Sequence, residues 1–495
     1  MSELRFNVLT DPWIPLDVQG RVRHASYVEL LTGERDGEDL IHPRDDVRFY
    51  ARMLLSALTQ ALFPTKDAKE LRKRIVEPLS REVVEDRIAS FKGDFELIGE
   101  QAFLQSSDAS ERENATASLF FDSRHDLFRP AHAYDAICLR CAPAVLYGVH
   151  AFATSGGRGY SPSVRGTPPI TTMVGLPSVR RTTWANVLSD AERAALAYPT
   201  DPERPWLFRT EAKTGEMIGL VEGLFWQPRA VRLVPTEEGS CCACGQVGVR
   251  LLASGYAANS KVMGGTYRHP WSPAWEDTSP KAKRRWAYRN FRSDRPSWTG
   301  FTDLLSDAQG SGRRGEKLAR PAPIVRQWTE RLDPDSGASL LVLDYSADKA
   351  RIRGRVCEAF PFSRQIADPE FGQYVRSLVE RAEDVFRALE NALSHVRRKG
   401  GGSKVKGYWL YDANAAFWQR SEAPFWETFE ASLRGELDAD GRFLERIERI
   451  ALDLFDEHAS SSANDPQWIA HVVRARGRLL ARFAQRRKEA ARAVA

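Results

Sequence analysis

The stretch SCCACGQ, residues 240–246, holds three of the six cysteines in this chain of 495 residues, and two more stand in AICLRCAP, residues 136–143. Each stretch contains one C-x-x-C pair. A two-residue spacer lets two thiolates reach one metal ion from a tight turn, so two such turns complete a tetrahedral structural zinc site. The predicted zinc ligands are Cys138, Cys141, Cys241 and Cys244.

Two other interpretations of these cysteines stay open. The pairs lie about a hundred residues apart, farther than in a usual zinc ribbon, so the two loops must meet in the folded chain. The same residues could be reduced thiols in a small core. They could also be a redox pair, although CLRC follows no thioredoxin-like pattern. Cys357 stands alone and is expected to be a core thiol.

The bulk composition is that of a globular protein with more than one domain. Hydrophobic residues make up 42% of the chain and charged residues 28%, and the net charge is +5. No apolar run is long enough to span a membrane, and the start MSELRFNVLTDPWIPL lacks the regions of a signal peptide. We therefore expect the chain in the cytoplasm, where disulfides are rare.

The pattern along the chain predicts an α+β fold in two parts. Residues 45–63 have the 3.6-residue period of a helix, and short runs such as LLVLDY (340–345) indicate strands. Glycine, proline and serine interrupt these elements often. Residues 1–365 are predicted to form a large mixed domain with short sheets and the zinc-stapled loops.

Four amphipathic stripes predict a C-terminal four-helix bundle over residues 366–495. The last stripe is strongly basic, because residues 474–492 hold eight basic residues and one acidic residue. Such a stripe can follow a nucleic-acid backbone or form a solvated helix face. The arginines expected to face DNA are Arg474, Arg476, Arg478 and Arg482.

The sequence indicates a binding protein more than an enzyme. It has no P-loop. The one candidate catalytic pair in the sequence is the His125–Asp126 dyad. The stretch ATSGGRGYSPSVRGTPP, residues 153–169, holds four glycines. Glycine lets a ligand approach the backbone without a side chain in the way, so this stretch is a candidate binding loop.

An ordered set of motifs resembles the CasA family, the large subunits of the type I-E CRISPR surveillance complex Cascade. The motifs fall between residues 5 and 300 in the order of the family, and the C-terminal part agrees in its four-helix character. They are LTDPWIPL, PRDD (43–46), FLQ (103–105), CLRC, VRGTPPITT (164–172), GLFWQP (223–228), CCACGQ, HPWSP (269–273) and PSWTG (296–300).

The resemblance implies a subunit without enzymatic activity. Guide RNA reads the target by base pairing, and the protein reads a short flanking motif, the protospacer-adjacent motif, in the minor groove of duplex DNA and starts strand separation. The implied partners are the other Cascade subunits, the 5′ end of the crRNA, target DNA, and a helicase–nuclease that the subunit helps to recruit.

The same resemblance assigns binding residues by position. The guide-RNA loop begins at Phe120, Phe121 and Asp122. The glycine loop includes Gly156, Gly157, Arg158 and Gly159, and the lysine finger falls at Lys261. The minor-groove wedge falls at Lys349 and Ala350, and Lys349 replaces the glutamine of the family.

Two alternatives from other functional classes stay open. One is a zinc-stapled metal-dependent nuclease or phosphohydrolase that uses His125 and Asp126; metal-dependent cleavage by the isolated chain would favour it. The other is a helical scaffold without a nucleic-acid role, which the loss of all salt-dependent DNA binding would favour.

Overall fold

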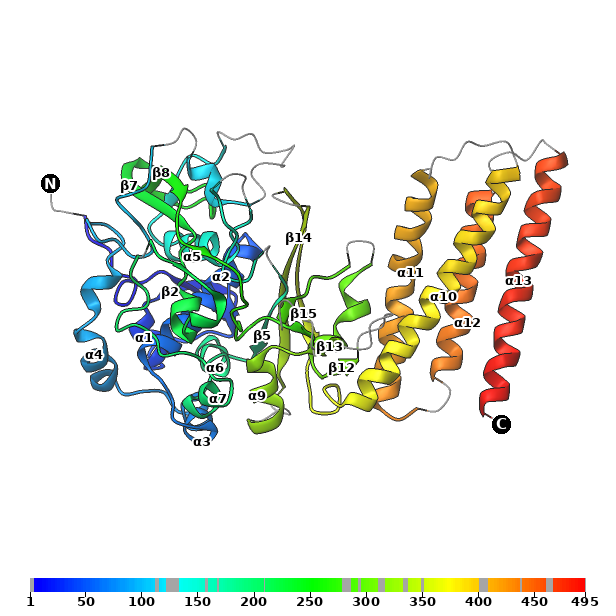
Figure 1. Cartoon of the computed structure of the whole chain (residues 1–495), viewed down its shortest axis with the longest axis horizontal. Helices are drawn as coiled ribbons and strands as arrows, with labels where there is room; N and C mark the ends of the chain where they lie inside the picture. Colours follow the sequence, from blue (N-terminus) through cyan, green and yellow to red (C-terminus); the bar gives the residue numbers. More distant parts are fainter. Residues whose placement is uncertain are drawn as a thin grey trace. The chain divides into compact units, whose positions relative to one another are not determined.

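The computed structural model divides the chain into two compact units (Figure 1). The first unit comprises Met1–Phe291 and Asp303–Ala367, and the second comprises Arg292–Thr302 and Asp368–Ala495. The structure describes residues 4–111, 115–121, 133–155, 159–166, 169–208, 210–277, 286–292, 295–309, 317–332, 337–348, 351–399, 408–436, 439–459 and 466–494.

The core of the first unit is built around α2 (Asp45–Leu62), the helix predicted over residues 45–63. Most of its side chains are buried, which fits a helix enclosed on nearly every side. Helix α5 (Ala142–Ala151) packs closely on it at Gly148, where a Cβ would lie 2.2 Å from the ring of Tyr50. Only glycine allows this approach, which fixes the start of α5 and thus the first cysteine pair near α2.

Two hairpins of the first unit carry the predicted binding elements. Strands β7 (Arg229–Ser240) and β8 (Val247–Ala258) pair antiparallel, and β4 (Ile137–Cys138) joins the edge of β8. Strands β14 (Ser339–Asp348) and β15 (Arg351–Pro361) form the other hairpin, with β5 (Thr171–Gly175) on β14. The LLVLDY run therefore lies in β14, as a strand, as predicted.

Short helices and three small sheets complete the first unit. The sheet orders are β2-β1-β3, β11-β10-β13-β12 and β6-β9. Their strands are β1 (Ile14–Val18), β2 (Arg21–Ala25), β3 (Asp39–Leu40), β6 (Ala212–Lys213), β9 (Lys261–Val262), β10 (Ala274–Asp277), β11 (Trp286–Tyr288), β12 (Ala308–Gln309) and β13 (Lys317–Arg320). The helices are α1 (Tyr27–Leu31), α3 (Ala68–Val76), α4 (Arg81–Ala89), α6 (Val179–Ala185), α7 (Asp190–Ala195), α8 (Leu220–Leu224) and α9 (Pro323–Arg331).

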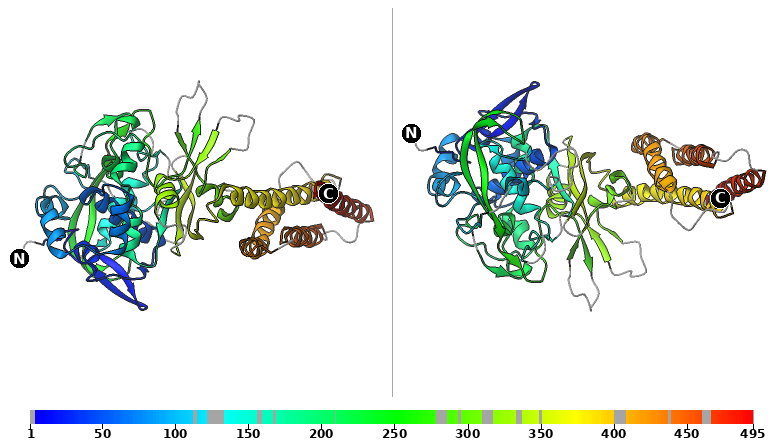
Figure 2. Two further views of the ribbon diagram at one scale, coloured as in Figure 1. Left: turned by 90° about the horizontal axis from the view of Figure 1, so that it is seen from below. Right: turned by 90° about the horizontal axis from the view of Figure 1, so that it is seen from above.

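Four long helices make up most of the second unit. They are α10 (Pro369–Lys399), α11 (Tyr408–Leu433), α12 (Ala439–Ala459) and α13 (Pro466–Val494). Consecutive helices run in alternating directions, and α10 packs against each of the other three (Figures 1 and 2). The apolar stripes face inward, with Leu378, Phe443 and Phe483 fully buried.

The short segment Arg292–Thr302 belongs to this helical unit, although the sequence analysis placed it before the boundary at 365/366. Trp298 stacks on Phe425 of α11 with ring centroids 4.4 Å apart, and Phe301 lies 5.6 Å from Phe429. Both inserted side chains are at most 2% exposed. The PSWTG motif thus supplies part of the core of the helical unit. Among the described residues, no helix is long and apolar enough to cross a membrane.

We predict that Trp298→Ala destabilises the helical unit by about 3–5 kcal/mol, because the substitution leaves a cavity between the inserted segment and α11. Native-state hydrogen exchange of α10 and α11 in the full chain measures this loss of protection. The control is Tyr411→Ala on α11, whose side chain is 65% exposed. Equal protection in the two variants would contradict the structural role of Trp298.

Candidate metal centre and candidate nucleic-acid interface

The four predicted ligands come together, with their Sγ atoms all within 4.8 Å of one another. Cys138 ends β4 and Cys141 immediately precedes α5, while Cys241 and Cys244 stand in the turn between β7 and β8. The pairing of β4 with β8 brings the two distant loops to one place. Among the described residues, this is the one group of histidine, cysteine and acidic side chains placed to hold a metal ion.

The backbone of both turns is arranged for thiolates. The N–H of Cys138 donates to Sγ of Cys241 at 3.2 Å, and the N–H of Ala243 donates to the same sulfur at 3.4 Å. Gly245 closes the second turn with a φ of +75°, a conformation that favours glycine. These N–H groups stabilise negative charge on sulfur, which a metal-bound cysteine carries.

The geometry of the cluster fits a tetrahedral metal ion. Sγ of Cys138 lies 3.7 Å from Sγ of Cys244. Four sulfurs at about 2.3 Å from a central zinc ion would stand about 3.8 Å from each other. Hydrogen bonding from the thiol of Cys138 lowers the pKa of Cys241, so the cluster already favours a thiolate there. The donor set suits a soft divalent ion such as zinc.

The other two cysteines are not part of this cluster. Burial raises the pKa of Cys242 to about 12, and burial raises the pKa of Cys357 to about 11. Both thiols therefore stay protonated near neutral pH. Cys357 lies on β15 and is partly buried, so it serves as a packing residue.

His42 is an outer partner of the cluster that the sequence analysis missed. Its Nε2 lies 3.4 Å from Sγ of Cys141, and the backbone N–H of Arg44 donates to its Nδ1 at 3.0 Å. Nδ1 also lies 3.1 Å from the carbonyl oxygen of Arg44, so the tautomer decides whether Nε2 donates to sulfur or Nδ1 donates to that carbonyl. Burial lowers the pKa of His42 and keeps the ring neutral. The only sequence signal was its place directly before the PRDD motif.

The two phenylalanines assigned to the guide-RNA loop pack within the first unit. Phe120 is 4% exposed, its ring lies 5.2 Å from that of Tyr134, and the guanidinium of Arg44 lies 4.9 Å from its centroid. Phe121 is partly exposed and meets Tyr345 edge to face at 5.7 Å. Phe120 therefore has the environment of a core residue, and Phe121 is the more accessible of the two.

Several predicted site residues lie outside the described residues. These are Asp122, Gly156, Gly157, Arg158, Lys349 and Ala350, together with His125 and Asp126 of the alternative nuclease hypothesis. The described flanks still locate two of the elements. Residues 349–350 connect β14 to β15, and Gly159 ends the glycine-rich segment.

Gly159 lies beside the end of β8, which precedes Lys261 in the sequence. Gly159 has a φ of +89°, which favours glycine, and a Cβ there would stand 3.9 Å from Cβ of Ala258. Ala258 ends β8, and Lys261 begins β9 three residues later with an exposed side chain. Gly159 and the end of β8 are about a hundred residues apart in sequence and thus lie side by side in the fold.

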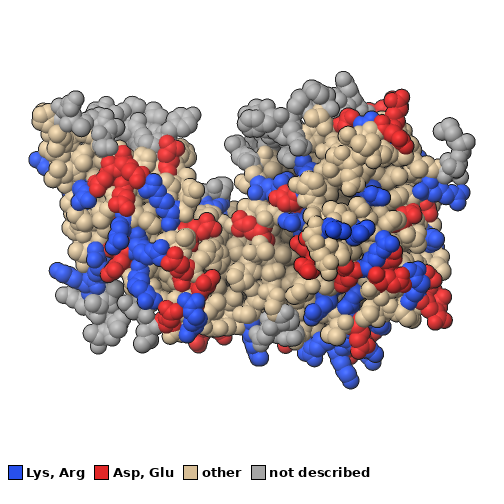
Figure 3. Space-filling model, turned by 180° about the vertical axis from the view of Figure 1, so that it is seen from behind, with Lys and Arg blue, Asp and Glu red and all other residues tan. Residues whose placement is uncertain are grey.

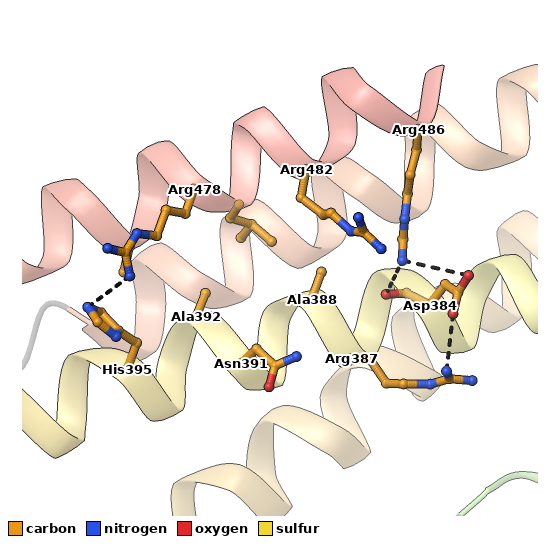
Figure 4. Close-up of a pocket in the computed structure, with 11 residues that line it drawn as sticks. Asp384, Arg387, Ala388, Asn391, Ala392, His395, Arg478, Arg482 and Arg486 are labelled. Atoms are coloured by element: carbon orange, nitrogen blue, oxygen red, sulfur yellow. Dashed lines mark hydrogen bonds and ion pairs between the residues drawn. The ribbon is translucent and has the colours of Figure 1, made fainter. Parts of the chain in front are cut away.

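A basic groove of about 430 Å³ lies between α10 and α13 of the helical unit (Figure 4). Small side chains, including Ala388 and Ala475, form part of its lining. Four arginines and one aspartate also line it: Arg387, Arg478, Arg482, Arg486 and Asp384. The groove therefore carries an excess of positive charge.

The arginines of this groove are only partly neutralised. Asp384 pairs with Arg387 at 3.3 Å and with Arg486 at 3.6 Å, and Arg387 also pairs with Glu383 at 3.3 Å. Arg478 donates to His395 at 3.3 Å. Arg482 has no ion pair among the described residues. Burial lowers the pKa of Arg486, and the nearby Arg482 adds to this effect.

The remaining arginines of the α13 stripe differ in environment. Arg474 is exposed one turn before Arg478, on the same side of α13. Arg476 instead forms an ion pair with Asp456 of α12, with Nε–Oδ1 at 2.8 Å, and does not line the groove. On the face drawn in Figure 3, basic and acidic side chains are interspersed.

The comparisons with known proteins agree with this fold. The sequence matches the family model described as CRISPR-associated protein Cse1 over residues 7–454. CRISPR-associated protein CasA/Cse1 of Thermus thermophilus is 22% identical over 437 residues, 82% of this chain and 80% of the relative. The structure of Thermus thermophilus CasA (Cse1) has a TM-score of 0.73 at 18% identity, covering 97% of this chain and 99% of that chain.

A chain from a structure described as a CRISPR RNA-guided surveillance complex has a TM-score of 0.69 at 16% identity, covering 96% of this chain and 99% of that chain. The mixed unit and the helical C-terminal region are therefore a fold shared with CRISPR-associated proteins. The chain belongs to the Cse1 family, also named CasA. The family predicted from the ordered motifs is confirmed.

Proposed function

We propose that the chain is the non-catalytic large subunit of a type I-E CRISPR surveillance complex. In this role it reads the protospacer-adjacent motif through the minor groove, starts strand separation for crRNA pairing and helps to recruit the helicase–nuclease, in antiviral defence. The observation that supports the proposal, beside family membership, is that Gly159 lies against Ala258 at the end of β8, three residues before Lys261.

Each reading element has a physical role in this proposal. The glycine loop lets the backbone approach the floor of the minor groove. The groove displays acceptors at every base pair, so Lys261 can donate to them without a strong choice among bases. The tip of the β14–β15 hairpin, with Lys349 and Ala350, is the wedge, and unstacking a base step costs a few kcal/mol. Lys349 in place of glutamine favours tolerance of several motifs.

The crRNA and the target strands use other surfaces in this proposal. The 5′ end of the crRNA binds at the loop that starts with Phe121 and Asp122, while Phe120 holds the base of that loop in the core. The α10–α13 groove, with Arg474 and Arg478 along α13, follows the phosphates of flanking or displaced DNA. Its narrow, small-residue lining allows a backbone to approach the arginines closely.

The proposed metal of the cysteine cluster is structural zinc. Zinc in such a site joins the two loops and contributes directly to folding. We predict one equivalent of zinc per chain by elemental analysis, and loss of zinc with a lower melting temperature in Cys244→Ser. The control Cys357→Ser should keep its zinc. Less than about half an equivalent in undamaged wild-type protein would contradict the four-thiolate site.

We predict that Lys261→Ala and Lys349→Ala weaken binding of duplex targets by about tenfold or more, because each removes a charged hydrogen-bond donor from the groove. The same complexes should still bind the target supplied as a single strand. Binding is measured for the assembled complex with each flanking trinucleotide, and Lys73→Ala on α3 is the control. Equally weakened binding of single-stranded targets would leave these lysines as general electrostatic partners of nucleic acid.

We predict that neutralising Arg478 and Arg482 together weakens DNA binding to a similar extent for all sequences. The plot of log affinity against log salt should become shallower by about 0.7–0.9 for each phosphate that the variant no longer neutralises. The matched control is Arg476→Gln, since Arg476 is already paired with Asp456. A changed sequence preference with an unchanged salt slope would exclude binding of the DNA backbone by these arginines.

A further inference from the structure

Arg229, the first residue of β7, spans the two stems of the glycine-rich loop. One terminal nitrogen donates to the carbonyl oxygen of Ser161 at 2.6 Å, and the other donates to that of Thr154 at 2.5 Å. One planar guanidinium group therefore closes a loop whose ends are seven residues apart. Arg229 is only 2% exposed, so it cannot contact DNA as the chain stands.

The remaining contacts of Arg229 fix the guanidinium in place. Its Nε donates to the hydroxyl of Tyr256 at 3.1 Å, and its guanidinium carbon lies 5.2 Å from the ring centroid of Tyr160. Tyr160 is itself stacked on Tyr256, with centroids 6.2 Å apart and planes 14° apart. The loop residue Tyr160 thus contacts both Tyr256 of β8 and Arg229 of β7.

The guanidinium of Arg229 is satisfied by neutral acceptors. Its hydrogen-bond acceptors in the described part of the chain are all neutral: Thr154, Ser161, Pro228 and Tyr256. Burying a cation without a counterion costs free energy. The hydrogen bonds that Arg229 donates to several carbonyl oxygens offset part of that cost. A lysine ammonium also has three N–H donors, but all three lie on one nitrogen. It therefore lacks the planar fork that places two separate nitrogens on the two stems.

The residues directly before Arg229 hold the Lys261 turn. The backbone N–H of Asn259 donates to the carbonyl of Pro228 at 3.1 Å, and its side-chain amide donates to the carbonyl of Gln227 at 2.7 Å. Arg229 also stands opposite Ala258 in the β7–β8 ladder. Residues 227–229 therefore support both the glycine loop and the turn that leads to Lys261.

We propose that Arg229 is a positioning residue for reading the flanking motif: it fixes the glycine loop relative to the Lys261 turn, so that both enter one groove. This inference rests on the proposed function and adds a residue that does not itself touch DNA. The hydrogen bonds from Arg229 hold the two stems at Thr154 and Ser161 together, so losing them would add an ordering cost to each duplex bound.

The first test uses Arg229→Lys in the assembled complex, with duplex targets that carry each flanking trinucleotide and with the same target as a single strand. We expect affinity for the best duplex to fall roughly tenfold or more, since the variant removes two hydrogen bonds from a charged donor. The ratio between the best and the worst trinucleotide should fall toward one. Binding of the single strand should be unchanged.

The matched control is Arg232→Lys, three residues along the same strand, where the guanidinium donates to the carbonyl of Glu100 at 3.3 Å and spans no loop. A milder variant, Tyr256→Phe, removes the acceptor for Nε and should weaken duplex binding several-fold without removing the charge. Hydrogen exchange of amides in residues 159–163 gives a readout besides binding. We expect faster exchange there in Arg229→Lys and no change in Arg232→Lys.

The outcomes separate this inference from the function on which it rests. If wild-type complexes bind all flanking trinucleotides with equal affinity, that result contradicts both the proposed function and the role of Arg229. If the wild type discriminates and Lys261→Ala weakens duplex binding while Arg229→Lys changes neither affinity nor exchange, only the role of Arg229 is overturned. Equal weakening on duplex and single strand in Arg229→Lys would also overturn it, as the mark of general damage.

Discussion

The β7–β8 hairpin is the constraint on which the candidate sites depend. Its turn carries Cys241 and Cys244, and the cluster ties that turn to β4 and to the start of α5. Its open end carries Arg229 opposite Ala258, beside the glycine loop. The β7–β8 ladder connects these two ends, with shifts of register between Arg232 and Leu233 and between Thr236 and Gly239.

The network around the PRDD motif extends this constraint to the second hairpin. His42 contacts Cys141, and the backbone of Arg44 fixes its ring. The side chain of Arg44 pairs with Asp46 at 2.7 Å, and Asp46 in turn accepts from Arg355 of β15 at 2.9 Å. Asp46 is buried, so this arrangement is a satisfied polar network rather than a surface ion pair. A continuous chain of hydrogen bonds and ion pairs therefore connects the cysteine cluster, the start of α2 and the β14–β15 hairpin.

The sequence predicts what depends on local pattern and misses what depends on long-range packing. Helix α2, strand β14, the four long helices and the four clustered cysteines all follow from periodicity or spacing. The insertion of Trp298 into the helical unit does not, because no local pattern shows which core an aromatic residue joins. His42 was missed for the same reason, since its contact with Cys141 spans 99 residues. Arg229 directly follows the GLFWQP motif. Its proposed role depends on the folded structure, which brings the carbonyl groups of Thr154 and Ser161 to one guanidinium group.

A protein that binds the minor groove must distinguish DNA sequences mainly by the shape of the groove. The groove offers acceptors at every base pair and one extra donor at G·C, so a lysine that donates to acceptors gains little selectivity from hydrogen bonding. Selectivity then comes from how rigidly the backbone and the lysine are held against a groove of given width. Residues that never reach the DNA can therefore contribute as much as residues that do. The side chain of Arg229 has the burial, the fork geometry and the two loop stems that such a role requires.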